Sequence, residues 1–187
     1  MAIGAHQITS VDTDRLILGN YKIETATSSS ATFVNLGPGM LTSWAHNFTN
    51  SNIQTGNSVD PMEYISDENL TFAFEMIEWD CSAISALQGG LTNTGTITSV
   101  TSTLRAGGAT EITKRAFKMT NTQTIDDGTV ETVITVFRAA VEGVMTMGLK
   151  SDNDADPINL FQFTCKGEND ASLSAGAQLF TILKTET

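Results

Sequence analysis

The segment from Asn69 to Glu78 limits the possible folds of this chain more than any other. Four large apolar residues occupy every second position in it: Leu70, Phe72, Phe74 and Met76. Smaller or polar residues fill the positions between them. Because successive side chains of a β-strand point to opposite faces, this alternation predicts a strand with one face in a hydrophobic core.

This predicted strand leads into the one segment that predicts a helix. Asp80 can accept hydrogen bonds from the free N–H groups of a first turn, and Gly89-Gly90 suits a left-handed C-terminal cap. The apolar stripe between them is narrow, as in a short helix that lies on a sheet: Cys81 or Ala83, Ile84 and Leu87. Elsewhere, frequent threonine and serine and short apolar runs between glycine, asparagine and aspartate clusters predict a mostly β fold.

A long β-hairpin is predicted in the second half of the chain. Lys114–Ile125 and Thr129–Phe137 flank Asp126-Asp127-Gly128, and an Asp-Gly step favours a tight hairpin turn. Four residues of the second arm share one face: Val130, Thr132, Ile134 and Val136. The rest of the hairpin is largely polar, and a lone two-stranded ribbon is marginal in water. We therefore expect it to pair with something else, such as another subunit.

Two further features of the first half predict irregular structure. Gly37-Pro38-Gly39 is a strong turn signal between a strand at 31–36 and another at 40–48. Residues 49–67 are rich in asparagine and acids, contain Pro61 and show little periodicity, which predicts a long exposed loop. The 187 residues suffice for one domain, residues 1–187, with its own core.

The charge of the chain narrows its partners. It has 21 acidic and 10 basic residues, a formal net charge of −11. Tight nucleic-acid binding depends on clustered lysine and arginine, so this composition disfavours it. Cys81 and Cys165 are too few for a disulfide framework. The chain shows no signal sequence or membrane-spanning run, so we expect it to fold in a cytoplasm without contacting a membrane.

No motif predicts catalysis, a metal site or a cofactor. Asp152, Asp154 and Asp156 resemble the start of a calcium loop, but the glycine and bidentate acid of such a loop are missing, so a solvated turn is favoured. His6 and His46 have no neighbouring ligands at zinc spacing. Nucleophile elbows and phosphate-binding loops are absent from the sequence. We expect a protein that is not an enzyme and needs no cofactor.

The order of elements resembles the major tail tube protein of long-tailed bacteriophages. The resemblance covers about residues 68–184 and rests on pattern. It is carried by the strand 69–79 with its helix 80–88 and by the C-terminal segments 137–147, 159–163, 166–170 and 179–182. It implies a β-sandwich or barrel subunit with a short flanking helix and a long hairpin. Six such subunits would form a ring, and stacked rings would form a hollow tube.

The resemblance also implies partners and contact residues. The loop at 49–67 would reach a neighbouring ring or subunit through Asn52, Asp60, Glu63, Tyr64 and Asp67. The hairpin would line the lumen or join subunits through Lys118, Gln123, Asp126, Asp127 and Glu131. DNA would pass without specific binding, since an acidic lumen repels phosphate.

The implied partners are other copies of the chain and other tail proteins, such as the tape measure, terminator and baseplate proteins. The tube would be part of the virion tail, assembled in the host cytoplasm. Two alternatives remain open. One is another virion β-protein, such as a tail terminator, a baseplate component or a phage-like secretion tube; the other is a carbohydrate- or cell-surface-binding β-sandwich module.

Overall fold

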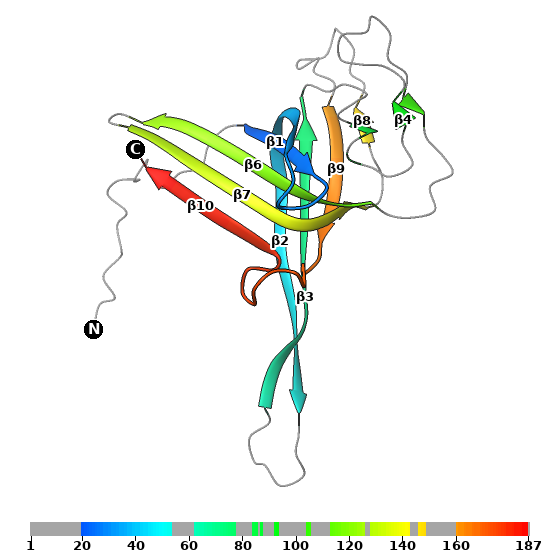
Figure 1. Ribbon diagram of the computed structural model, residues 1–187, viewed down its shortest axis with the longest axis vertical. Coiled ribbons are helices and arrows are strands. Elements are labelled where there is room, and N and C mark those ends of the chain that lie inside the picture. The colour runs from blue at the N-terminus through cyan, green and yellow to red at the C-terminus, as the bar shows by residue number, and fades with distance from the viewer. Residues whose placement is uncertain are drawn as a thin grey trace, which may run out of the picture.

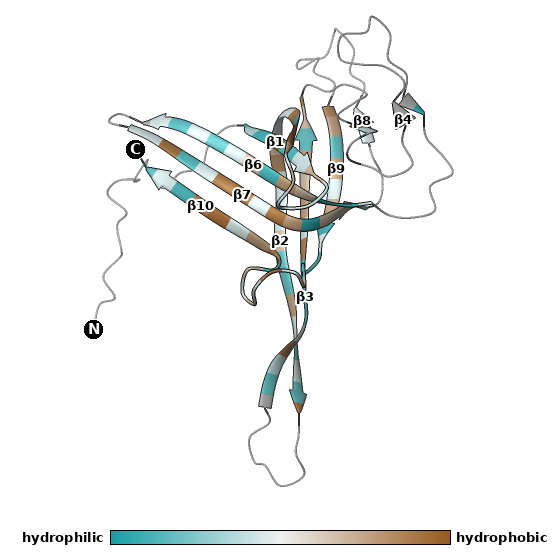
Figure 2. Ribbon diagram, viewed as in Figure 1, coloured by the Kyte–Doolittle hydropathy of each residue, from teal (hydrophilic) through white to brown (hydrophobic). Residues whose placement is uncertain are grey.

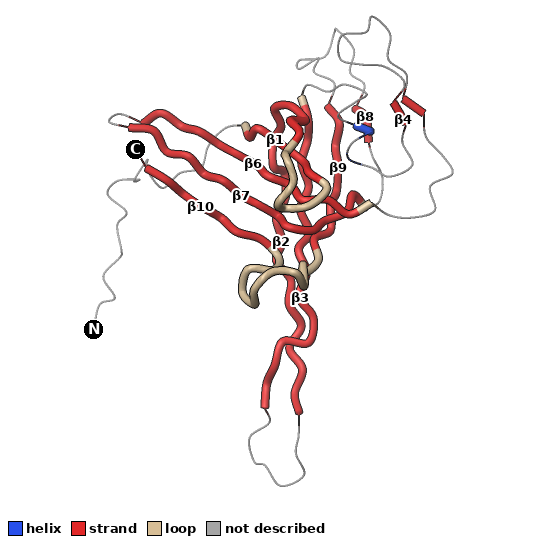
Figure 3. The backbone as a smooth tube through the Cα atoms, in the orientation of Figure 1, coloured by secondary structure: helices blue, strands red, loops and turns tan. Residues whose placement is uncertain are grey.

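The fold is built almost entirely from antiparallel strands (Figure 1, Figure 3). The computed structural model describes residues 20–53, 62–77, 84–85, 87, 92–93, 104–105, 113–125, 128–142, 146–148 and 160–186. Its strands are β1 (Tyr21–Ala26), β2 (Val34–Ile53), β3 (Met62–Met76), β4 (Thr92–Asn93), β5 (Leu104–Arg105), β6 (Lys114–Ile125), β7 (Gly128–Val141), β8 (Thr146–Gly148), β9 (Leu160–Gly167) and β10 (Phe180–Glu186). This confirms the mostly β prediction.

The described strands form one curled sheet that closes on itself. Its order is β10-β7-β6-β1-β2-β3-β9-β8, and β4 pairs separately with β5. The C-terminal part of β7 also pairs with β9, with Ala139 opposite Gly167 and Val141 opposite Cys165. This extra pairing joins β7, β6, β1, β2, β3 and β9 into a closed barrel. Closure removes the free edges of the strands that take part in it.

The core fills the inside of this barrel. β3 contains the predicted strand from Asn69 as far as Met76, and the four alternating apolar residues are fully buried: Leu70, Phe72, Phe74 and Met76. Phenylalanines from other strands pack on them, with ring centroids 5.3 Å apart for Phe74 and Phe163 and 5.6 Å apart for Phe72 and Phe117. Such aromatic pairs add about 0.5–1.5 kcal/mol beyond the area they bury.

The helix prediction is confirmed where the structure describes it. Ile84, Ser85 and Leu87 are helical, and the Ile84 and Leu87 side chains belong to the buried core. The proposed caps, at Asp80 and Gly89-Gly90, lie outside the described residues. None of the helical residues that the structure describes belongs to a segment long and apolar enough to cross a membrane.

Two predictions in the first half are wrong. No turn separates two strands at 37–39, because β2 runs without interruption from Val34 to Ile53. The glycines instead form an irregularity: Gly37 has a φ of 124°, its N–H donates to Asn35 Oδ1 at 3.1 Å, and the register of β1 against β2 shifts between Ile23 and Glu24. Because the neighbouring strands keep this segment paired, the local turn signal produces a bulge in a continuous strand.

The predicted loop at 49–67 is also corrected. β2 continues to Ile53 and β3 begins at Met62, so most of that range is strand, and only 54–61 lies outside the described residues. Asn50 pairs with Ile65 and Ser51 with Tyr64. The backbone hydrogen bonds between two hairpin strands do not depend on apolar side chains. A polar segment can therefore form strands that its composition does not predict.

Two groups of strands extend beyond the barrel (Figure 1). We call residues 46–53 of β2 and 62–69 of β3 the ribbon. Within the described chain, β2 beyond Gly39 pairs only with β3, and β3 before Leu70 pairs only with β2. We call residues 117–125 of β6, 128–136 of β7 and 180–186 of β10 the arm. It contains the predicted hairpin, which is confirmed, with β10 added along β7.

Candidate assembly surfaces

The arm has two chemically different faces, set by the alternation of its strands (Figure 2). Rows of paired residues place Phe117, Val136 and Phe180 on one face, followed by Met119, Ile134 and Ile182. Val130, Thr132, Ile134 and Val136 are all buried, as their spacing predicts. This apolar face stabilises the arm, whereas a two-stranded hairpin alone would be marginally stable in water.

The opposite face of the arm is rich in hydroxyl groups, and we call it the hydroxyl face. Seven threonines share it: Thr120, Thr122, Thr124, Thr129, Thr135, Thr181 and Thr185. Its charged side chains are Lys118 and the exposed Glu131. Lys118 Nζ lies 2.9 Å from Glu24 Oε2, and Lys22 Nζ lies 2.8 Å from the other oxygen of Glu24. Glu24 balances one of these two lysine charges, and Glu131 adds a second negative charge to the hydroxyl face.

The two lysines also affect the pKa of Glu24. Its side chain is largely buried; burial raises its pKa, but the hydrogen bonds and charges of Lys22 and Lys118 outweigh burial and hold the pKa below its usual value. Lys118 also lies 4.8 Å from the centroid of the Phe33 ring. Lys118 is thereby fixed to the base of the arm.

The predicted hairpin residues are not brought together on one surface. Lys118 and Glu131 lie on the hydroxyl face, whereas Gln123 lies on the opposite face, half-buried, and donates from Nε2 to Asn121 Oδ1 at 2.9 Å. Asp126 and Asp127 lie outside the described residues.

The outer edge of the arm carries exposed apolar side chains. β10 pairs with β7 along its whole length, and within the described chain nothing pairs with its other edge. Ile182 is 54% exposed and Leu183 is 60% exposed, and they point to opposite faces of the strand. Ile182 continues the buried row of Met119 and Ile134 to the edge. A free strand edge with apolar side chains is a site for pairing with another chain.

The ribbon carries a mixture of apolar and acidic side chains. Phe48, Ile53, Tyr64 and Ile65 are all exposed large apolar residues. Of the predicted contact residues, Asn52 and Glu63 face each other across the two strands, Tyr64 lies opposite Ser51, and Asp67 lies opposite Thr49; all four are exposed. Asp60 lies outside the described residues.

Phe180, the first residue of β10, ties the arm to the ribbon. Its ring meets Trp44 edge-on, with centroids 5.1 Å apart, and His46 edge-on, with centroids 5.4 Å apart. Trp44 in turn packs on the core ring of Phe72 at 5.9 Å. Alternate residues of β2 thus hold Phe180 in place, which sequence patterns could not show because β2 and β10 are distant in the chain.

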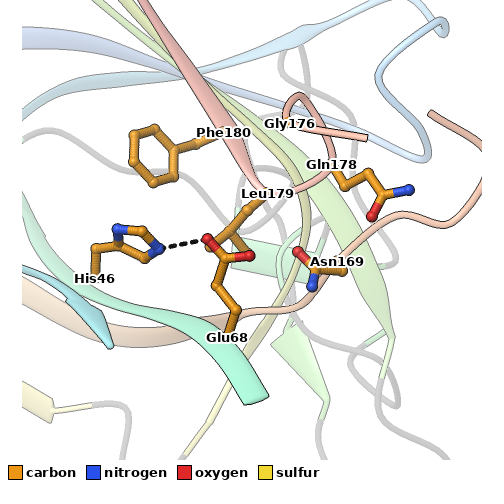
Figure 4. Close-up of a pocket in the computed structure, with 7 residues that line it drawn as sticks. All are labelled: His46, Glu68, Asn169, Gly176, Gln178, Leu179 and Phe180. Atoms are coloured by element: carbon orange, nitrogen blue, oxygen red, sulfur yellow. Dashed lines mark hydrogen bonds and ion pairs between the residues drawn. The ribbon is translucent and has the colours of Figure 1, made fainter. Parts of the chain in front are cut away.

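A pocket of 240 Å³ lies beside this aromatic contact (Figure 4). It is lined by His46, Glu68, Asn169, Gly176, Gln178, Leu179 and Phe180. His46 Nε2 lies 2.7 Å from Glu68 Oε1 across the strands of the ribbon. No sequence pattern indicates this pair, since the two residues are 22 positions apart.

The loop between β9 and β10 supplies the other wall of the pocket. The Asp170 carboxylate accepts hydrogen bonds from Ser172 Oγ at 2.7 Å and Ser172 N at 3.0 Å, and these bonds lower its pKa. Gly176 takes a left-handed conformation with a φ of 85°. The N–H of Asp170 donates to the carbonyl of Gln178 at 2.8 Å, which fixes the two ends of the loop.

Among the described residues, we find no arrangement of side chains like those of enzyme active sites or metal sites. They contain no group of three or more histidine, cysteine or acidic residues placed to hold a metal ion. Asp152, Asp154 and Asp156 lie outside them. Cys165 is buried, and burial raises the pKa of its thiol far above the usual value, so the thiolate that reacts is suppressed.

Comparisons with known proteins give little further information. No protein-family model matches the sequence, and no curated protein matches it. One solved structure that matches this chain weakly is the cap that terminates the tube of the anti-feeding prophage. It is 12% identical to this chain, with a TM-score of 0.43, and the match covers 99% of this chain and 100% of the other. A match of this strength does not assign a function.

Proposed function

We propose that this chain is a structural, non-enzymatic subunit of a bacteriophage tail, and that copies of it form rings that stack into a hollow tube. The observation that carries the proposal is the arm. It combines a buried apolar face, the hydroxyl face and the outer edge of β10. Within the described chain this edge is unpaired, and it exposes Ile182 and Leu183. A monomer gains nothing from such an edge, whereas an assembly would bury it.

A head-to-tail ring needs a second, different surface for the β10 edge to meet, and the far side of the arm offers one. On that side, β1 pairs with β6 only as far as Thr120. If β10 of one copy meets the far side of the arm in the next, the contact is head-to-tail, and head-to-tail contacts close into rings or continue as filaments. Six copies per ring follow from the resemblance to tail tube proteins.

The hydroxyl face suits the wall of a channel for DNA. Threonine hydroxyls hydrogen-bond water and carry no charge, Lys118 pairs with Glu24, and Glu131 repels phosphate. A net charge of −11 acts in the same direction. DNA would slide along such a wall without being held.

The ribbon is proposed to contact a neighbouring ring or subunit. It extends beyond the barrel as a two-stranded element and exposes Phe48, Ile53, Tyr64 and Ile65. An isolated ribbon of this kind is marginal in water, so burial against a neighbour would stabilise it. Asn52, Glu63 and Asp67 would then form the polar rim of that contact.

The partners of the tube would be the chain itself and the other tail proteins that start, measure and close it. The subunit would assemble in the host cytoplasm and end in the virion tail.

The test is negative-stain electron microscopy of the purified chain over a range of concentrations, with light scattering at each concentration. Hollow filaments or stacked rings support the proposal. Single rings that never stack would instead point to a terminator. Compact monomers at every concentration, together with a melting temperature raised by glycans, would replace the proposal with a carbohydrate-binding module.

A further inference from the structure

The pocket beside Phe180 has unused hydrogen-bonding groups. Glu68 uses Oε1 for His46, and since a carboxylate only accepts, His46 Nε2 donates this bond. Gln178 uses Nε2 to donate to the Leu173 carbonyl at 2.9 Å. Within the described chain, these bonds leave the second oxygen of Glu68 and the side-chain oxygen of Gln178 without a donor.

Asn169 adds to this set of acceptors. Its side chain lies across the pocket from Glu68 (Figure 4) and makes no polar contact with the described residues. His46 Nε2 is used, whereas Gln178 Nε2 keeps one N–H and the Asn169 amide carries two, so the two amides can accept or donate while Glu68 only accepts. The pocket thus offers a carboxylate oxygen and two amide oxygens to a group that carries several N–H or O–H donors.

The remaining walls of the pocket favour a flat cation. The ring of Phe180 borders it, and an aromatic ring attracts a cation near its face. Glu68 supplies negative charge to the pocket, and no cationic side chain lines it. A guanidinium is flat and carries five donors in a fixed arrangement.

We propose that this pocket binds the guanidinium group of an arginine from a second copy of the chain. The choice of a second copy rests on the proposed function, whereas the preference of the pocket for a guanidinium does not. The volume of 240 Å³ accommodates the end of one side chain. The contact would fix the base of the ribbon and the first residue of β10 to a neighbour at the same time.

Of the arginines that the structure describes, Arg105 is the one best placed to supply this group. Arg115 is half-buried, with its Nε atom out of contact with solvent. Arg138 lies close enough to Glu168 and Asp170 to lower the pKa of both. Arg105 is exposed on β5, whose partner β4 lies at the end of the molecule away from the ribbon (Figure 1). It can therefore enter the pocket only from another copy.

The first experiment tests the pocket alone. N-acetyl-arginine amide is titrated into the full chain, below the concentration of assembly, while NMR follows the imidazole of His46. The expected result is saturable binding that is at least tenfold weaker for N-acetyl-citrulline amide, which has the same shape without the charge. Glu68→Gln should weaken arginine binding by about tenfold or more, since a hydrogen bond to a charged group contributes about 1.5–3 kcal/mol. Equal binding of both probes, or no effect of Glu68→Gln, would overturn the proposal.

The second experiment tests the source of the arginine. Glu68→Gln, Arg105→Gln and the double variant are compared by the concentration at which assemblies appear. If the two side chains meet, each single change raises this concentration about tenfold and the double change adds little more. If the shift in the double variant equals the product of the two single shifts, or if Arg105→Gln has no effect, this contact is ruled out. If the unaltered chain never assembles, the proposed function fails, and the titration alone decides on the pocket.

Discussion

Replacing the two exposed apolar residues of β10 is the most direct test of its edge as an assembly surface. In the variant Ile182→Thr/Leu183→Thr, both replacements are threonine, which is also favoured in strands, so the pairing of β10 with β7 should persist. Somewhat more than half of each side chain is already in water, so the free energy of unfolding of the subunit should fall by only about 1–2 kcal/mol.

The effect on assembly follows from the exposed fractions. Full burial of a leucine or isoleucine side chain contributes about 1.5–3 kcal/mol. With 54% of Ile182 and 60% of Leu183 still exposed, a contact could gain about 1–2 kcal/mol from each. Removing both should cost roughly 2–3 kcal/mol per contact, and every 1.4 kcal/mol is tenfold. The concentration needed for assembly should therefore rise about 30- to 100-fold.

Light scattering against concentration measures this shift, and urea unfolding checks the subunit. Val34→Thr is a matched control, because Val34 is 54% exposed at the start of β2, outside the arm. Its assembly concentration should stay within about twofold of the unaltered chain. The reasoning would be refuted by an unchanged assembly concentration in the double variant, or by an equal shift in Val34→Thr.

Three further predictions concern the subunit itself. Phe180→Ala removes the contacts with Trp44 and His46 and should cost about 2 kcal/mol in urea unfolding, less than the 3–5 kcal/mol of a fully buried phenylalanine; a loss below 0.5 kcal/mol would contradict the contact. Gly39→Ala places a Cβ 2.4 Å from Ile23 Cδ1 and 2.6 Å from the Glu75 carbonyl oxygen, so it should cost about 1–3 kcal/mol. Gly148→Ala places its Cβ at an ordinary contact distance of 3.9 Å from the Leu160 carbonyl oxygen and should be nearly neutral. Glu24→Gln should destabilise the chain at neutral pH: the pKa of Glu24 is lower in the folded state, so its stabilising contribution is complete above its unfolded pKa of about 4.5 and is lost as the pH falls through the folded pKa. The difference in melting temperature between this variant and the unaltered chain should shrink below pH 4.5, and a constant difference down to pH 2 would argue against it.

Short-range patterns predicted a large part of the fold and little of the candidate sites. The alternation in β3, the hairpin of β6 and β7, and the buried positions Ile84 and Leu87 were all visible in the sequence. The ribbon was missed because its strands are polar and hydrogen-bond through their backbones. The pocket was missed because its walls come from β2, β3 and the loop before β10, which are far apart in the chain.

The sequence by itself determined which faces of the strands are apolar, because side-chain direction alternates with period two and depends only on neighbouring residues. It also determined the net charge of −11, from which we expect weak binding of polyanions. The tertiary structure alone decided that β7 pairs with both β9 and β10, that Gly37 and Gly39 lie in a continuous strand, and that Phe180 meets Trp44 and His46. These outcomes depend on pairing between distant segments, where the gain from burying many side chains together exceeds any local preference.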